Sequence, residues 1–497
     1  MSDNVLKVEG VAKAFGGVQA LKGVSLEIKK GEIHCLAGEN GCGKSTLIKI
    51  ISGVHEPDAG TIEIEGRRFA RLAPMQAIAL GVQVIYQDFS VFPNLSVMEN
   101  LALNMEVMDH RVFMNYRRAR AIAAHAVSQI GFDIDLDERV ETLSVADRQL
   151  IAICRALLQN SKLIIMDEPT AALTKREVKA LFNVIKDLQS RGISILFVSH
   201  KLDEVFEISE RFTILRGGEN VASGSTRDLD RRAFALSMTG REFTDESYRP
   251  VASPGPPVLS VRNLTRRGAY ANISFDLAPG EILGITGLLG SGRTELVETI
   301  FGVVQPDSGS IEVGGKPTRL RSVKDAIRAG VGYVPSDRLT EGLFLPQTIE
   351  RNLVVAVLER LSGWFGVLRR QGVAETTERW ITDLSIATKD PFLPVRTLSG
   401  GNQQKVVLAR WLANDLKVLI LNGPTMGVDI GSKYDIHALI RKLAEHGLAV
   451  VIVSDDLPEV LACASRIVVM QNGAFVHELD PASTTETKLG ELSTGVA

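Results

Sequence analysis

The chain repeats itself once, and the two copies are about half its length apart. Two glycine-rich loops, opened by Gly38 and Gly287, are separated by 249 residues (287 − 38). Further landmarks follow in the same order at offsets of 249 or 255 residues: Gln87 and Ser336, Ser144 and Ser399, Asp167 and Asn422, His200 and Asp455. A repeat constrains the fold more strongly than any local pattern. A unit of this size predicts two copies of one domain in tandem.

The domain boundaries follow from the repeat and from a proline-rich stretch between the copies. Residues 248–257 read YRPVASPGPP, with four prolines and one glycine, and proline resists both helix and central strand. We predict a first domain over residues 3–240, a linker over 241–257 and a second domain over 258–497. Hydrophobic content of 45% with 23% charged residues is ordinary for globular domains.

Charge and cysteine usage exclude several classes of protein. A net charge of −3 provides no basic footprint for nucleic acid. The four cysteines form no C-x-x-C pair, which predicts buried free thiols in a reducing compartment. Residues 1–10 lack the pattern of a signal peptide, and the longest apolar runs fall far short of the about 20 residues of a membrane helix. If the protein acts at a membrane, other subunits must span it.

The first glycine-rich loop is a P-loop in its required context of strand, loop and helix. Residues 33–46 read IHCLAGENGCGKST, followed by the helical pattern LIKII. Backbone N–H groups and the positive end of the helix bind phosphate oxygens. Lys44 reaches the β- and γ-phosphates, and the Ser45 hydroxyl binds Mg²⁺. The predicted nucleotide-binding residues are Gly38, Glu39, Asn40, Gly41, Cys42, Gly43, Lys44, Ser45 and Thr46.

Two carboxylates follow a buried strand in the first copy. Residues 163–170 read LIIMDEPT, four apolar residues followed by Asp167 and Glu168. We predict that Asp167 holds Mg²⁺ and that Glu168 polarises an attacking water as the catalytic base.

Three further residues of the first copy complete its predicted site. His200 ends the strand ILFVSH and is expected to contact the γ-phosphate. Gln87 ends the run VIYQ and is expected to contact the γ-phosphate and Mg²⁺. Phe15 either stacks on adenine or packs in the core.

Read together, these motifs resemble the Walker A, Q-loop, Walker B and H-loop of ATP-binding cassette (ABC) ATPases. Residues 398–403, LSGGNQ, resemble the signature of that family. The resemblance implies an α/β fold of two tandem P-loop NTPase domains, each with a RecA-like α/β core, an antiparallel β subdomain and a helical signature subdomain. It also implies that ATP lies between the P-loop of one cassette and the signature of the other, here Ser399, Gly400, Gly401 and Asn402.

A closer resemblance is to the fused double cassettes of bacterial monosaccharide importers, some of whose relatives carry polyols. It rests on the degenerate first signature LSVADRQ, on the second P-loop GLLGSGRTE with Arg293 in the lysine position, and on LSGGNQQK. It implies an ATP-hydrolysing, energy-coupling subunit that uses ATP and Mg²⁺. The implied partners are two transmembrane permease subunits and a periplasmic sugar-binding protein. The implied location is peripheral, on the cytoplasmic face of the inner membrane.

The second copy has lost most catalytic side chains. Asn422 and Gly423 replace the two carboxylates, Asp455 replaces the histidine and Ser336 the glutamine. In the first signature, the residues after Ser144 are Val145, Ala146 and Asp147, where the second signature has Gly400, Gly401 and Asn402. We therefore predict ATP hydrolysis only at the site built from the first P-loop and the second signature. The predicted nucleotide-binding residues of the other site are Gly287, Gly292, Arg293 and Thr294; whether that site holds nucleotide stays open.

The alternative is a soluble tandem-cassette ATPase that acts on ribosomes or nucleic acid. Such a protein would favour a basic helical linker or zinc-binding cysteines and two complete sites, none of which this sequence has. A regulatory module without turnover disagrees with the complete first site. Phe89, Phe92 and Pro93, which follow Gln87, suit either a permease coupling helix or simple loop packing.

Overall fold

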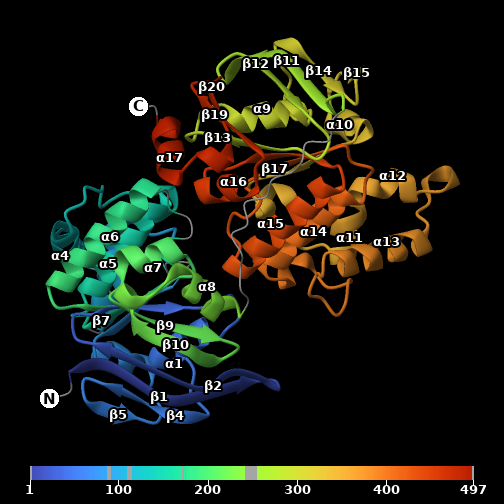
Figure 1. Ribbon diagram of the computed structural model, residues 1–497. Coiled ribbons are helices and arrows are strands. Elements are labelled where there is room, and N and C mark those ends of the chain that lie inside the picture. Colours follow the sequence, from blue (N-terminus) through green and yellow to red (C-terminus); the bar gives the residue numbers. More distant parts are fainter. Residues whose placement is uncertain are drawn as a thin grey trace. The chain divides into compact units, whose positions relative to one another are not determined.

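A computed structural model gives the fold and describes residues 3–86, 91–108, 115–170, 173, 175–240 and 255–494. The chain divides into two compact units, Met1–Phe243 and Thr244–Ala497. The main strands and helices of one unit recur in the other in the same order (Figure 1). Within the described ranges, no helix combines the length and the apolar character that crossing a membrane requires.

A six-stranded sheet forms the centre of the first unit, in the order β10-β9-β3-β8-β7-β6. Its strands run parallel except β10, which is antiparallel to β9. Every residue of β3 and β8 is buried, as expected for parallel strands covered on both faces. The strands are β3 (Ile33–Ala37), β6 (Val82–Ile85), β7 (Leu163–Asp167), β8 (Ser194–Val198), β9 (Arg211–Arg216) and β10 (Glu219–Ser225). The helices of this core are α1 (Lys44–Ile51), α2 (Pro74–Ala79), α6 (Lys175–Ser190), α7 (Leu202–Ile208) and α8 (Arg231–Thr239).

A four-stranded antiparallel sheet, in the order β2-β1-β4-β5, packs against α1. Its buried side chains, such as Leu6, Val8 and Leu26, belong to one apolar cluster with Leu47 and Ile51 of α1. This packing holds the helix that follows the P-loop between two sheets. The strands are β1 (Asn4–Phe15), β2 (Val18–Lys29), β4 (Ala59–Ile64) and β5 (Arg67–Phe69).

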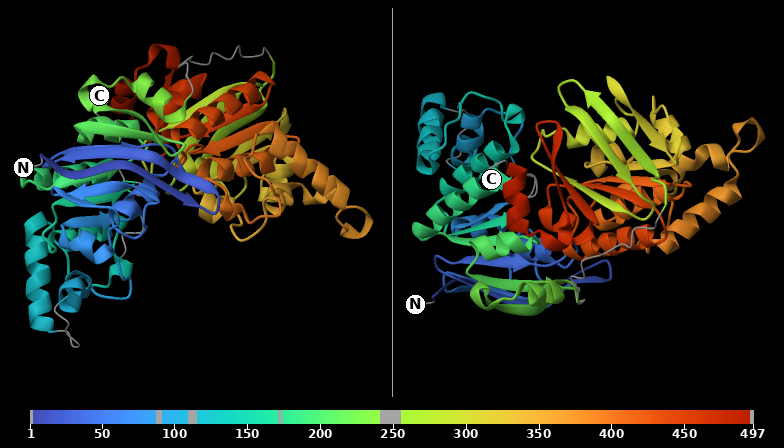
Figure 2. Two further views of the ribbon diagram at one scale, coloured as in Figure 1. Left: turned by 90° about the horizontal axis from the view of Figure 1, so that it is seen from below. Right: turned by 45° about the horizontal axis from the view of Figure 1, so that its top comes forward.

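Three helices form a separate lobe of the first unit, which projects from its sheets in the left view of Figure 2. Ala119, Ala123 and Ala126 line the buried face of α4, where Leu101 of α3 and Ile151 of α5 share their cluster. Small side chains on that face let the neighbouring helices approach closely. The helices are α3 (Val97–Met108), α4 (Tyr116–Ile130) and α5 (Val145–Leu157).

The second unit has the same two sheets, in the orders β16-β17-β18-β13-β19-β20 and β12-β11-β14-β15. The strands are β11 (Leu259–Arg266), β12 (Tyr270–Leu277), β13 (Ile282–Thr286), β14 (Ser308–Val313), β15 (Lys316–Pro317), β16 (Val331–Val334), β17 (Val418–Asn422), β18 (Ala449–Val453), β19 (Arg466–Gln471) and β20 (Ala474–Leu479). The helices are α9 (Arg293–Ile300), α10 (Val323–Ala329), α11 (Ile349–Val354), α12 (Leu358–Leu361), α13 (Arg370–Asp383), α14 (Gly400–Leu412), α15 (Ile430–Glu445), α16 (Leu457–Cys463) and α17 (Glu486–Thr494).

These architectures confirm the predicted fold class, an α/β core with an antiparallel β subdomain and a helical subdomain in each half. The prediction for the thiols is also confirmed, because all four cysteines, Cys35, Cys42, Cys154 and Cys463, are buried and free.

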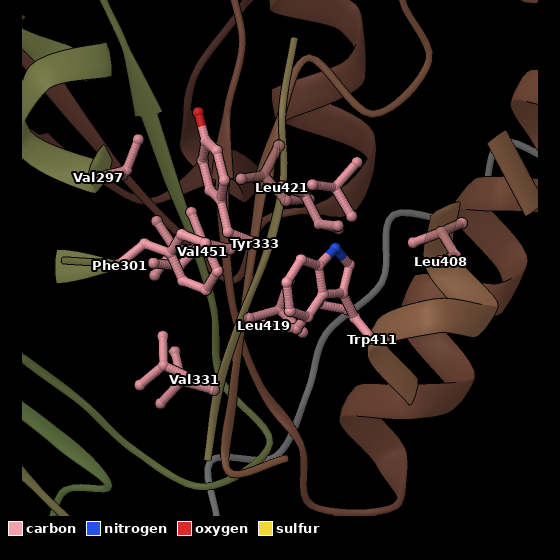
Figure 3. Packing of buried hydrophobic residues seen from close by; sticks show 14 of the residues in the cluster. Val297, Phe301, Val331, Tyr333, Leu408, Trp411, Leu419, Leu421 and Val451 are labelled. Atoms are coloured by element: carbon pink, nitrogen blue, oxygen red, sulfur yellow. The ribbon is translucent and has the colours of Figure 1, made fainter. Parts of the chain in front are cut away.

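An aromatic cluster joins the helical subdomain of the second unit to its central sheet. Phe301 stacks on Tyr333 of β16 with ring centroids 5.1 Å apart, and it meets Trp411 of α14 edge-on at 5.2 Å. Figure 3 shows the Trp411 side chain extending from its helix toward Leu419 of β17. Because α14 begins at the second signature, this cluster helps to hold the signature in place against the sheet.

Phe301→Ala should lower the free energy of unfolding of the second unit by about 3–5 kcal/mol, because it leaves a cavity beneath two aromatic rings. All three tryptophans of the chain, Trp364, Trp380 and Trp411, lie in this unit, so tryptophan fluorescence during a urea titration reports on it. Phe392→Ala is the control: Phe392 is 64% exposed, so the change should be below about 0.5 kcal/mol. Equal losses in the two variants would contradict the packing role of Phe301.

Candidate nucleotide-binding sites

The first P-loop connects β3 to α1 and encloses the Lys44 side chain. Gly38, Gly41 and Gly43 have positive φ angles of 154°, 82° and 106°. Lys44 is only 6% exposed, and its Nζ donates hydrogen bonds to the carbonyl oxygens of Gly38 at 2.6 Å and Glu39 at 3.0 Å. The loop therefore holds a buried ammonium group among its own backbone groups, at the N-terminus of a helix that favours anions.

Two carboxylates and a histidine meet beside this loop, at the carboxyl ends of β7 and β8. Nδ1 of His200 lies 3.0 Å from Oε1 of Glu168. Burial acts to raise the pKa of Glu168, but the hydrogen bond and charge of His200 keep that pKa below its ordinary value. Glu168 also has a positive φ of 47°, unusual for a residue with a side chain, while its N–H donates to Val198 at 3.1 Å. The backbone thus turns this carboxylate out of the strand toward His200.

Asp167, at the end of β7, fits the role of a Mg²⁺ ligand. Burial, followed by the charge of Glu168, raises its pKa, while a hydrogen bond with the Ser45 side chain lowers it. A partly buried carboxylate beside a second one is unfavourable unless a cation compensates it. The hydroxyl and carboxylate oxygens of Ser45 and Asp167 are the donor types that Mg²⁺ prefers.

Of the other predicted residues of the first unit, the structure describes Phe15 but not Gln87 or Phe89. Gln87 lies outside the described residues, as does Phe89, so their predicted roles stay predictions. Phe15 is 43% exposed, with Lys13 Nζ 5.5 Å from its ring centroid and the His55 ring edge-on at 5.3 Å. A ring this exposed has room for a planar ligand, and adenine stacking stays a prediction.

A buried carboxylate that sequence reasoning missed ties the ends of β7 and β8 together. Glu204 of α7 accepts hydrogen bonds from Thr170 at 2.5 Å and from Ser199 at 2.6 Å, which follow β7 and β8. Glu459 of α16 accepts the same bond from Thr425 at 2.6 Å in the second unit. A search for polar residues kept in both copies would have found this pair, since each partner recurs at the offset of 255 residues (459 − 204, 425 − 170).

The second P-loop keeps the backbone of the first around different side chains. Arg293 occupies the position of Lys44, is 8% exposed, and donates from Nη1 to the Gly287 carbonyl at 2.7 Å. Burial lowers the pKa of this guanidinium, while the charge of Asp455 acts in the opposite direction. A cation therefore remains inside the loop, with a carboxylate close enough to influence it.

The carboxylate positions of the second unit carry neutral residues. Asn422 is buried at the end of β17, and its Nδ2 donates to the Tyr333 hydroxyl at 3.3 Å. Gly423 takes the left-handed turn of Glu168, with a φ of 61°, at no steric cost. No acid or base from this strand end can therefore act on a water molecule.

The two signature segments differ in how their serines are used. Ser144 caps α5 by accepting from the Asp147 N–H, and its hydroxyl also donates to the Asp147 carboxylate at 2.7 Å. Ser399 makes no such cap, and its Oγ accepts a hydrogen bond from Nδ2 of Asn402 at 2.9 Å. Both serines are exposed, but Ser399 keeps its own proton to donate, whereas Ser144 already donates to Asp147 in its own turn. The serine of the second signature therefore keeps a hydroxyl donor that the serine of the first does not.

Two glycines let the second signature pack tightly on its own unit. A Cβ at Gly401 would overlap the Ser432 side chain of α15, and one at Gly400 would lie 2.8 Å from Nη2 of Arg338. Arg338 in turn donates to the carbonyl oxygens of Met426 at 2.6 Å and Gly427 at 2.8 Å. The start of α14 is therefore held against α15 and the loop after β17.

Comparison with known sequences identifies the family. The profile described as ABC transporter matches residues 21–171 and again residues 270–426. The second match starts 249 residues after the first (270 − 21) and ends 255 residues after it (426 − 171), the two offsets of the repeat. The chain belongs to the ABC transporter family. It is an ATPase of that family with two cassettes.

Similar proteins match over almost the full length. The "Ribose import ATP-binding protein RbsA" of Bacillus licheniformis is 40% identical, covering 99% of each chain, and the "Ribose import ATP-binding protein RbsA 3" of Rubrobacter xylanophilus is 42% identical with the same coverage. A "Putative ribose/galactose/methyl galactoside import ATP-binding protein" of Geobacillus kaustophilus is 38% identical, covering 99% of this chain and 98% of that one. A solved ATP-binding cassette of an ABC transporter, in its ADP conformation, is 26% identical with a TM-score of 0.41, covering 45% of this chain and 92% of that one.

Gly401→Ala should destabilise the second unit by about 1–3 kcal/mol, because its methyl group overlaps Ser432. Ser432→Gly removes the obstructing side chain, so the double variant should recover at least about 1 kcal/mol relative to the sum of the single changes. Urea titration followed by tryptophan fluorescence measures this cycle. Strictly additive losses would show that Gly401 and Ser432 do not constrain each other.

Proposed function

We propose that this chain is the energy-coupling subunit of a bacterial importer for a monosaccharide or related polyol, and that it hydrolyses ATP at one of two composite sites. The names of the similar proteins, which cover 99% of this chain, support import of a ribose-type sugar. Its partners in this role are two permease subunits and a periplasmic sugar-binding protein. Its place is then peripheral, on the cytoplasmic face of the inner membrane.

The observation that supports the proposal is that the two units carry different side chains at the ends of equivalent strands, β7 and β8 in the first unit and β17 and β18 in the second. In the first unit, Glu168 contacts His200 at 3.0 Å beside the Lys44 loop. In the second unit, Gly423 and Asp455 stand in those two places. A general base contributes about 10²–10⁴ in rate, so its loss alone separates a hydrolytic site from a non-hydrolytic one.

Each residue of the first site has a distinct task in this proposal. Lys44 and the loop amides bind the β- and γ-phosphates, and Ser45, Asp167 and Gln87 hold Mg²⁺, which neutralises phosphate charge when bound. Glu168 accepts a proton from the attacking water. His200 orients that carboxylate and donates a hydrogen bond toward the γ-phosphate. Ser399, Gly400 and Gly401 of the other cassette complete the site.

The roles of the two cassettes then differ. Closure over ATP brings the second signature onto the first P-loop, and hydrolysis there releases the closed state. In this closed state the second P-loop would face Ser144, whose hydroxyl is already bound to Asp147. That site then contributes no turnover.

Glu168→Gln should reduce steady-state ATP hydrolysis by at least about 10²-fold, because the amide cannot accept the proton of the attacking water. Phosphate release from the purified full chain, or from the chain with its permeases, measures the rate. ATP binding should persist, since Lys44 and the loop are unchanged.

The matched control is Glu219→Gln, which removes an exposed carboxylate of the same unit that pairs with Lys22. It should keep the hydrolysis rate within about twofold of the unmodified chain, because exposed ion pairs contribute little. Near-normal turnover in Glu168→Gln would refute the assignment of the base, and with it the single hydrolytic site.

A further inference from the structure

The second P-loop keeps the shape of a phosphate-binding loop although its site lacks a base. Gly287, Gly290 and Gly292 have φ angles of 154°, 81° and 96°, against 154°, 82° and 106° in the first loop. The side chain that follows, Arg293, donates to the Gly287 carbonyl as Lys44 donates to that of Gly38. The backbone N–H groups of both loops are therefore arranged alike, at the start of a helix.

Arg293 places a buried positive charge inside this loop. The side chain is 8% exposed, and the charge that acts on it most is that of the exposed Asp455, which is not within ion-pair distance among the described residues. Burying a guanidinium is unfavourable unless it meets an opposite charge. The backbone N–H groups of the loop and Arg293 together favour binding of an anion at the position where a P-loop holds the β-phosphate.

The Asp455 carboxylate would repel a γ-phosphate bound at this loop. Ile285 of β13 pairs with Val453 of β18, so Gly287 and Asp455 each lie two residues beyond a paired residue. Leu36 pairs with Val198 in the first unit, which puts Gly38 and His200 at the same level there. Asp455 is exposed on the side where His200 would face the γ-phosphate. A γ-phosphate here meets a like charge.

The second site also lacks a donor set that fits Mg²⁺. Asn422 replaces the carboxylate, and its amide group is engaged with the Tyr333 hydroxyl at 3.3 Å. Tyr333 occupies the position of Val84 in the first unit, so this hydrogen bond exists only in the second. Mg²⁺ is bound in such sites by one or two carboxylates together with substrate phosphates. Without the metal, the additional charge of a triphosphate is not neutralised.

We propose that the second P-loop binds a nucleoside diphosphate, in preference to the triphosphate and without a requirement for Mg²⁺. This inference deepens the proposed function and rests on its non-hydrolytic second site. The chain would then carry ADP in one site while the other turns over ATP. Occupancy of the second loop would follow the level of ADP rather than that of ATP.

The test uses the full chain with Lys44→Ala, which disables nucleotide binding at the first loop. Fluorescent ADP and ATP analogues are titrated in EDTA and again with Mg²⁺. In EDTA, the ADP analogue should bind at least about tenfold more tightly than the ATP analogue, as expected for one added like-charge contact near a protein surface. Adding Mg²⁺ should change the Kd for the ADP analogue by less than about threefold. Arg293→Ala in the same background should abolish binding.

Two variants test the causes separately. Asp455→His should bring the two Kd values within about threefold of each other, and Asn422→Asp should make binding dependent on Mg²⁺. Absence of binding to the Lys44→Ala chain, tighter binding of the ATP analogue, or a strict need for Mg²⁺ would each overturn the proposal. These measurements involve no turnover, so they can fail while Glu168→Gln still abolishes hydrolysis, and the reverse.

Discussion

The in-register pairing of three parallel strands is the constraint on which the first site depends. Leu36 of β3 pairs with Val198 of β8, which also pairs with Asp167 of β7. The P-loop, His200 and the two carboxylates therefore leave the sheet at one level and one edge. Ligands bind at the carboxyl ends of parallel strands for this reason. A shift of one residue in either pairing would turn Asp167 or His200 away from Lys44.

The same backbone turn carries Glu168 in the first unit and a glycine in the second. Glu168 adopts a left-handed backbone conformation, which is unfavourable for any residue other than glycine. The side chain of His200 contacts the Glu168 carboxylate in this conformation. In the second unit Gly423 adopts the same conformation without strain. A glycine at this position therefore relieves the backbone and carries no side chain for acid–base chemistry. This explains why the strand end keeps its shape without the carboxylate.

Much of the fold and of the first site could be predicted from sequence because the motifs are local. The glycine loop, the carboxylates and the strands that carry them are each continuous in the chain, and the repeat offsets matched the family segments. The contacts that sequence reasoning missed join residues far apart: Glu204 to Thr170, and Tyr333 to Asn422. The hydrogen bond from Ser144 to Asp147 is local, but its significance depends on whether the hydroxyl points into the turn or out of it. Such orientations follow from packing and cannot be deduced from spacing.

The second copy can keep its signature without a carboxylate at its strand end because different elements carry these two features. The position of the proposed base is at the end of β17, whereas Ser399 caps α14 and Gly400 begins it, and Trp411 of that helix packs on Phe301, which stacks on Tyr333 of the sheet. Arg338 links the two, because its guanidinium binds the backbone of the loop after β17 and packs against Gly400. That link uses backbone carbonyls, so it does not depend on the side chain at position 423. A cassette built this way can lose the chemistry of its own strand end and still present an intact signature to a partner cassette.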